Sequence, residues 1–362
     1  EEVIAAPNRL LPLLLSRIDN VPGAIQVLQH ASIFGRRFTL THLSKILLPV
    51  VVRPPLLKEL ETAGIVFASQ RGQEITYIFK HALINEAIYS TIPLRNRAVL
   101  HKRAGRALND DNLLNNDAQI ARHYSAASAH KEAGEFFERS GDQAARVAAH
   151  AEAILEYTEA LGMIEYLPLS IKCMNKELIL NRKIAAQIIG SRGIPTSRAI
   201  PYYLTAQDLS RELGDQEEAV NAVWGLWSVH LILAELDDCL SILNDVIMDL
   251  DDQASPEARL IVSYMLGVTH TYRGSLGQAA DHLESVASFD TVTKRDELLH
   301  RFGMDIGLTT DSFLSWIYAL QGEAEWATNA SNRALQRSKE NNDGLSKAFA
   351  HVFSANKCLF LG

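Results

Sequence analysis

The chain has 362 residues, of which 47% are hydrophobic and 22% charged, a composition that excludes a disordered or fibrous protein. This length is long for one compact domain, so two units or an array of repeats are expected. No run approaches the roughly 20 apolar residues that cross a bilayer, so no membrane segment is expected. Cys173, Cys239 and Cys358 lie far apart, which predicts free thiols and a cytoplasmic location.

Charge divides the chain into two parts. Residues 1–108 hold 14 basic and 7 acidic residues and carry a net charge of +7, whereas the remainder carries −15. This asymmetry predicts two modules with different partners, and the acidic remainder disfavours nucleic acid as a partner. The chain begins at Glu1 rather than at methionine, so we expect it to be part of a larger protein.

The first module reads as helices followed by a β-hairpin. Helical segments are expected at 8–18, 21–34, 38–47 and 56–63, the last opened by a proline pair and closed by Gly64. Two runs of β-branched and aromatic residues, 65–69 and 75–80, flank a glycine-containing turn and predict a β-hairpin. The order of three helices and a two-stranded wing is typical of a winged helix, which we assign to residues 1–108.

Two helices separated by Pro93 follow the hairpin, and beyond residue 108 the strand signals disappear. Amphipathic, alanine-rich segments recur there, separated by short polar turns. The expected helices are 117–126, 130–149, 151–166, 176–189, 197–213, 216–233, 236–249, 256–272, 276–289, 310–320, 323–340 and 345–361. The spacing is irregular and mostly longer than the roughly 34 residues of a tetratricopeptide unit. The predicted fold is therefore mainly α: a small winged helix, then a tetratricopeptide-like α-solenoid over residues 109–362.

Three stretches carry a resemblance to a known family. They are YIFKHALINEAIYSTIPLRNRAVLH at 77–101, LPLLLSRIDNVPGAIQVLQHASIFGRRF at 11–38 and AVWGLWSVHLILAEL at 222–236. Together they resemble the winged-helix and repeat region of STAND-type regulatory ATPases. The most similar subgroup is the large signalling proteins that join a class III adenylate/guanylate cyclase domain to an ATPase and tetratricopeptide-like repeats.

The resemblance implies a role for His81. In these families a histidine that enters this helix contacts the phosphates of bound ADP in the closed state. A donor at a helix N-terminus fits that role, because the terminal amides also face an anion. Ala82 departs from the aspartate of the related H-D-L form. The alternative is that His81 caps the helix or bonds within the fold.

The helix after Pro93 is strongly basic, with Arg95, Arg97, Lys102, Arg103 and Arg106. We interpret these residues as a face toward the upstream nucleotide-binding domain of the same protein. The alternative is a solvated face paired with Glu59, Glu61 or Glu86.

In the tail, several side chains fall where repeat helices would line a ligand groove. The candidates are Trp224, Trp227, His230, Tyr264, His270, Tyr272, Asp305 and Trp316. Exposed aromatics in a groove would contact a peptide or small molecule. The alternative is that aromatics at helical spacing belong to the core between helices.

No phosphate loop, zinc-protease, nucleophile-elbow or cyclase metal motif is present, so we expect no enzyme activity, no metal and no cofactor in this chain. By resemblance, ATP or ADP with Mg²⁺ would bind elsewhere in the larger protein. The predicted function is that of a regulatory and sensor region: the repeats bind a protein or small-molecule inducer, and the winged helix gates the ADP-bound state. The alternatives are a DNA-binding transcription regulator and a passive helical-repeat scaffold.

Overall fold

The computed structural model describes residues 18, 21–47, 54–71, 74–110, 116–192, 196–251, 254–289, 294–340 and 344–361. These residues form two compact units, Glu1–Pro168 and Leu169–Gly362. The helix expected at 8–18 lies outside the described residues, apart from Ile18. No described helix is both long and apolar enough to cross a membrane.

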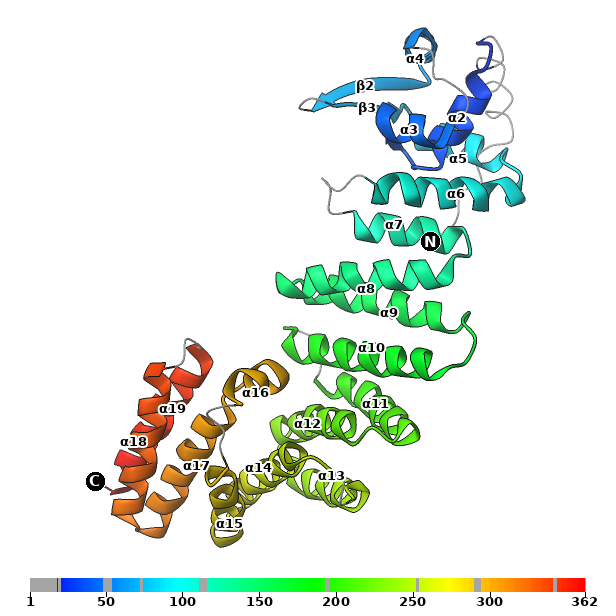
Figure 1. Ribbon diagram of the computed structural model, residues 1–362. Coiled ribbons are helices and arrows are strands. Elements are labelled where there is room, and N and C mark those ends of the chain that lie inside the picture. The colour runs from blue at the N-terminus through cyan, green and yellow to red at the C-terminus, as the bar shows by residue number, and fades with distance from the viewer. Residues whose placement is uncertain are drawn as a thin grey trace. The chain divides into compact units, whose positions relative to one another are not determined.

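A small antiparallel sheet organises the first part of unit 1. Its strands are β1 (Arg37–Thr39), β2 (Val66–Arg71) and β3 (Glu74–Phe79), in the order β1-β3-β2. The helices around it are α2 (Ala24–Ser32), α3 (Leu40–Leu47), α4 (Pro54–Thr62), α5 (Ala82–Ser90) and α6 (Leu94–Asn109). Figure 1 shows these elements from blue to cyan.

The hairpin is confirmed, but strand β1 corrects the sequence prediction. We expected a helix to start at Phe38, yet Phe38 pairs with Tyr77 of β3 and the two rings stack at 5.7 Å. The helix begins only at Leu40, where the Thr39 hydroxyl accepts a hydrogen bond from the amide of His42. Three residues of strand are too short for the alternation that reveals a strand in a sequence.

Three further helices complete unit 1: α7 (Asp117–Ala126), α8 (His130–Arg146) and α9 (His150–Ile164). They follow the helix pattern that the sequence predicts, and each packs on the one before it. The domain boundary predicted at residue 108 lies between the expected winged helix and the expected repeats, and it stays a prediction.

Unit 2 is helical throughout its described residues. Its elements are α10 (Ile171–Gly190), the short 3-10 helix η1 (Thr196–Ala199), α11 (Ile200–Leu213), α12 (Gln216–Ile232), α13 (Leu236–Asp249), α14 (Pro256–Arg273), α15 (Leu276–Ala287), α16 (Arg295–Phe302), α17 (Ile306–Gln321), α18 (Ala324–Glu340) and α19 (Gly344–Leu361). Neighbouring helices pair in sequence order, as in α14 with α15 and α17 with α18. One large apolar core runs through α12 to α19.

Most helix limits of unit 2 match the prediction within a few residues, with two corrections. Helix α10 begins at Ile171 rather than Lys176, because the Ser170 hydroxyl caps it by accepting from the amide of Cys173. Helix α16 was not predicted at all, since RDELLHRF carries too few apolar residues to show a helical stripe.

Candidate functional site

An aromatic cluster on α12 contains three of the predicted groove residues. The Trp224 ring lies 5.2 Å from Trp227 and 5.8 Å from Tyr264 between ring centroids. From α16, Phe302 approaches Trp224 to 4.9 Å. Helices α12, α14 and α16 therefore meet around Trp224, which is only partly buried.

Two members of this cluster serve the core. Trp227 and Tyr264 are 4% and 2% exposed, and the Trp227 indole N–H donates to the Thr269 hydroxyl at 2.9 Å. Burial raises the pKa of the Tyr264 phenol. Both side chains are too buried to contact a ligand. They belong to the core between helices, which was the alternative interpretation.

The remaining groove candidates lie elsewhere in unit 2. His230 Nδ1 lies at hydrogen-bond distance, 2.7 Å, from the Glu235 carboxylate across the turn between α12 and α13. His270 stacks on His282 at 5.8 Å, and burial lowers its pKa. Asp305 is buried and caps α17, accepting from the amide of Leu308.

Tyr272 and Trp316 form a second aromatic group, with ring centroids 6.1 Å apart. Tyr272 is half exposed, whereas Trp316 packs edge-on against Phe353 of α19. No ring contact joins this pair to the Trp224 cluster within the described ranges. The predicted groove residues therefore divide among several places, and Trp224 marks the one where three elements converge.

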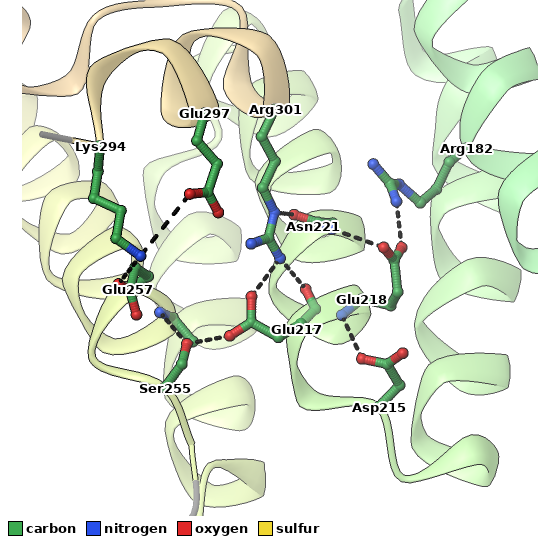
Figure 2. A network of polar contacts seen from close by, with 11 residues as sticks. Arg182, Asp215, Glu217, Glu218, Asn221, Ser255, Glu257, Lys294, Glu297 and Arg301 are labelled. Atoms are coloured by element: carbon green, nitrogen blue, oxygen red, sulfur yellow. Dashed lines mark hydrogen bonds and ion pairs between the residues drawn. The ribbon is translucent and has the colours of Figure 1, made fainter.

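A polar network at the starts of α12 and α14 was not predicted from the sequence (Figure 2). The Arg301 guanidinium of α16 donates to the Asn221 side chain and to both the backbone oxygen (3.0 Å) and carboxylate (2.6 Å) of Glu217 on α12. The Ser255 hydroxyl, which caps α14, also donates to the Glu217 carboxylate.

The same network extends to both sides. Lys294, directly before α16, pairs with Glu257 at 2.7 Å and holds the pKa of that carboxyl below its usual range. On the opposite side, Arg182 of α10 pairs with Glu218. The amide of Glu218 in turn donates to the Asp215 carboxylate, which caps α12. Acidic side chains at the starts of α12 and α14 thus face cations from α10 and α16.

In unit 1, His81 is the residue before α5 and lies two positions after the end of β3. Figure 1 shows both elements. Its backbone is extended (φ −130°, ψ 140°), its side chain is exposed, and it makes no capping hydrogen bond to the helix. The first amides of a helix have no partner within the helix. The amide of Ile84 donates to the His81 backbone oxygen, so the imidazole shares this end of α5 with the amides of Ala82 and Leu83.

The basic residues of α6 differ in their surroundings. Arg97 donates to the backbone oxygens of Ile92 and Ser90 and lies 4.6 Å from the Tyr89 ring centroid, so it stabilises the turn between α5 and α6. Arg95, Arg103 and Arg106 are exposed and Lys102 is half-buried. No ion pair joins these four to an acidic side chain in the part of the chain that the structure describes.

Two histidines that the prediction did not single out meet inside unit 1. Their Nδ1 atoms, of His101 on α6 and His123 on α7, lie 2.9 Å apart, and the Tyr89 hydroxyl lies 3.0 Å from His101 Nε2. Burial is the main cause that lowers the pKa of His123 to about 3, and the neighbouring His101 adds to it. A histidine in an alanine-rich helix gives no sign in the sequence that its partner lies 22 residues away.

Helix α4 bears on the DNA-binding alternative. Its described exposed face contains one basic residue, Lys58, beside Glu59 and Glu61, and Glu61 accepts a hydrogen bond from the amide of Ala68. This mixed, partly acidic face is a poor match for the phosphates and base edges of a major groove.

No family model matches the chain. An uncharacterised protein of Rhizobium meliloti (strain 1021), R02095, is 22% identical over 351 residues, which cover 94% of this chain and 33% of the relative. The chain therefore spans about one third of the length of that curated relative.

Among solved structures, the apo form of RapI matches 98% of this chain and 81% of its own at a TM-score of 0.51 and 14% identity. This likeness shows a helical-repeat fold of the tetratricopeptide type. The Rap conjugation gene regulator of plasmid pLS20 in complex with the Phr* peptide matches 96% of this chain and 80% of its own, at a TM-score of 0.47 and 14% identity. A STAND protein with a tetratricopeptide repeat sensor, PH0952 from Pyrococcus horikoshii, matches 93% of this chain and 60% of its own, at a TM-score of 0.39 and 11% identity. The last two likenesses are too distant to carry an argument.

Proposed function

We propose that this chain is the regulatory and sensor region of a larger STAND-like signalling ATPase. Residues 1–108 would form a winged helix that holds the ATPase closed around ADP, and residues 109–362 would form the repeats that bind an inducer. Inducer binding would then shift a two-state switch. By the sequence resemblance, a class III cyclase domain would be the output.

The observation that carries this proposal is the position of His81. Its imidazole is exposed at the N-terminal end of α5 and makes no capping bond there, so the alternative role as a helix cap has no support. An imidazole donor, open amides and the positive end of the helix dipole together suit a phosphate. Three exposed arginines on α6, Arg95, Arg103 and Arg106, supply further positive charge for a contact with the upstream nucleotide-binding domain.

The proposed division at residue 108 differs from the limit of the compact units and rests on the types of element. A helix, a strand, two helices and a hairpin whose second strand pairs with β1 lie before residue 108, and the described elements beyond it are helices. The helical repeats beyond it suit a sensor, because stacked helix pairs expose long surfaces for protein or peptide partners.

The test uses the intact larger protein. We expect ADP to co-purify with the wild type, and His81→Ala to lose most of it while output activity rises. His351→Ala, which removes an exposed histidine from α19, serves as the matched control and should retain ADP. Equal ADP in wild type and His81→Ala would make His81 structural, and a nucleotide-free wild type would favour the passive scaffold.

A further inference from the structure

Helix α16 stands outside the order of helix pairs in unit 2. Helix α15 packs directly on α17, and α14 also contacts α17, so the repeat continues without α16. Helix α16 contacts α17 and also reaches back to α12, where Arg301 bonds to residues 80 and 84 positions earlier in the chain. In Figure 2 it lies over the starts of α12 and α14. It is an insertion that covers a surface made by earlier helices.

The charges of α16 and of the surface beneath it are complementary. Arg301 faces Glu217 of α12, and Lys294 faces Glu257 of α14. Arg295 lies 3.3 Å from both Asp305 and Glu340. The partners of Arg295 belong to α17 and α18, whereas Glu217 and Glu257 make the surface of α12 and α14 beneath α16 acidic.

An apolar contact lies next to these ion pairs. Phe302 follows Arg301 directly, is 7% exposed and packs on the Trp224 ring, which stacks on Tyr264. The covered surface therefore accepts a cation and an adjacent aromatic ring together. This surface includes Trp224, one of the predicted ligand-contacting residues, with the buried Tyr264 ring behind it.

Two of the ion pairs that hold α16, Arg301 with Glu217 and Lys294 with Glu257, are partly open to solvent, whereas the pair of Arg295 with Asp305 is largely buried. The side chains of Arg301 and Glu217 are 22% and 39% exposed, and those of Lys294 and Glu257 are 40% and 19% exposed. Water and salt screen such pairs. A helix of eight residues also has little stability away from its contacts.

We propose that α16 occupies, within its own chain, the binding surface for a polypeptide segment that carries an arginine or lysine next to an aromatic residue. The incoming segment displaces α16 and takes its contacts with Glu217, Asn221 and Trp224. This inference rests on the proposed sensor role for its biological meaning, and it names the chemistry of the inducer. The resident helix also sets a threshold, because a tethered competitor acts at an effective concentration in the millimolar range.

The probe is a synthetic peptide of residues 294–302, KRDELLHRF, with blocked ends. It is titrated into the 362-residue chain, wild type and the double variant Arg301→Gln/Phe302→Ala, whose own α16 has lost both anchors. Tryptophan fluorescence follows binding near Trp224. We expect the double variant to bind at least tenfold more tightly than the wild type, because self-competition is weakened.

Matched substitutions test the surface itself. In the double variant, Glu217→Gln should weaken peptide binding about tenfold, since a charge-assisted hydrogen bond is lost. Glu212→Gln, the same change at an exposed position of α11, should leave binding unchanged. A control peptide with Arg301→Glu should not bind.

Two results would overturn the inference. One is peptide binding that fails at 1 mM in a double variant whose circular dichroism shows it to be helical. Equal binding to wild type and double variant, unaffected by Glu217→Gln, would count in the same way. The other comes from amide exchange in the wild type, which needs no variant: α16 amides should exchange about 100-fold faster than those of α14, and equal protection would contradict displacement. Neither outcome depends on ADP, so this inference and the proposed function fail separately.

Discussion

The buried contact between His101 and His123 predicts a specific loss of stability in acid. Two ring nitrogens 2.9 Å apart have room for one proton between them. A second proton would set two donors against each other in a site closed to water, beside Phe34 and the Tyr89 hydroxyl. Burial, and to a smaller extent the charge of Arg97, lower the pKa of His101 as well. The folded protein therefore keeps this pair neutral.

The magnitude follows from the pKa of His123, about 3 in the folded protein, against about 6.5 in an unfolded chain. Because the folded pKa is the lower one, the unfolded state takes up the proton first. The stability is complete above about pH 6.5 and declines as pH falls toward 3, by about 1.4 kcal/mol per pH unit. Between pH 6.5 and 5 the loss is about 2 kcal/mol.

Urea unfolding followed by circular dichroism at pH 7.5 and pH 5 measures this loss. His123→Gln removes one member of the coupled histidine pair, so the difference between the two proteins measures what the titration of the pair contributes. We expect the wild type to lose about 2 kcal/mol more than His123→Gln over this range, and His351→Gln, at an exposed position, to behave as wild type. An identical pH dependence for wild type and His123→Gln would refute the reasoning.

Two further predictions concern helix packing in the repeats. Gly225→Ala places a Cβ against the Tyr203 ring and should destabilise the protein by about 1–3 kcal/mol or more. Gly162→Ala adds a Cβ with nothing within 4 Å and should stabilise the protein by up to about 1 kcal/mol. Thermal unfolding measures both, and melting temperatures that shift in the same direction would contradict this packing. Thr269→Val leaves the buried Trp227 indole N–H without its acceptor and should cost about 1–3 kcal/mol, measured by chemical unfolding; an unchanged stability would mean that this bond does not form.

The repeat helices could be predicted because their periodic apolar positions and turn residues are local signals. Helices α7 and α13 have the limits that the sequence predicts. Likewise, Gly64 follows α4 with φ +69°, the left-handed conformation expected after a helix. Where the pattern is short or polar, as in β1 and α16, pairing with distant residues decides the structure and the sequence alone does not reveal it.

The candidate site illustrates the same limit. Trp224 and Tyr264 were expected together, and they do stack, but burial gives Tyr264 a place in the core. The sequence analysis did not predict the polar residues of the site, because Arg301 and Glu217 lie 84 positions apart in the chain. No spacing rule connects such a pair. It becomes visible only when the fold brings α16 onto α12.

We propose that this chain controls nucleotide retention in a larger protein, with His81 at the phosphates. The most direct test is the rate of ADP dissociation from the intact protein, measured with a fluorescent ADP analogue for wild type, His81→Ala and His351→Ala. Loss of a hydrogen bond to a charged phosphate should accelerate release by about 10- to 100-fold in His81→Ala alone. Equal dissociation rates in all three proteins would contradict the account.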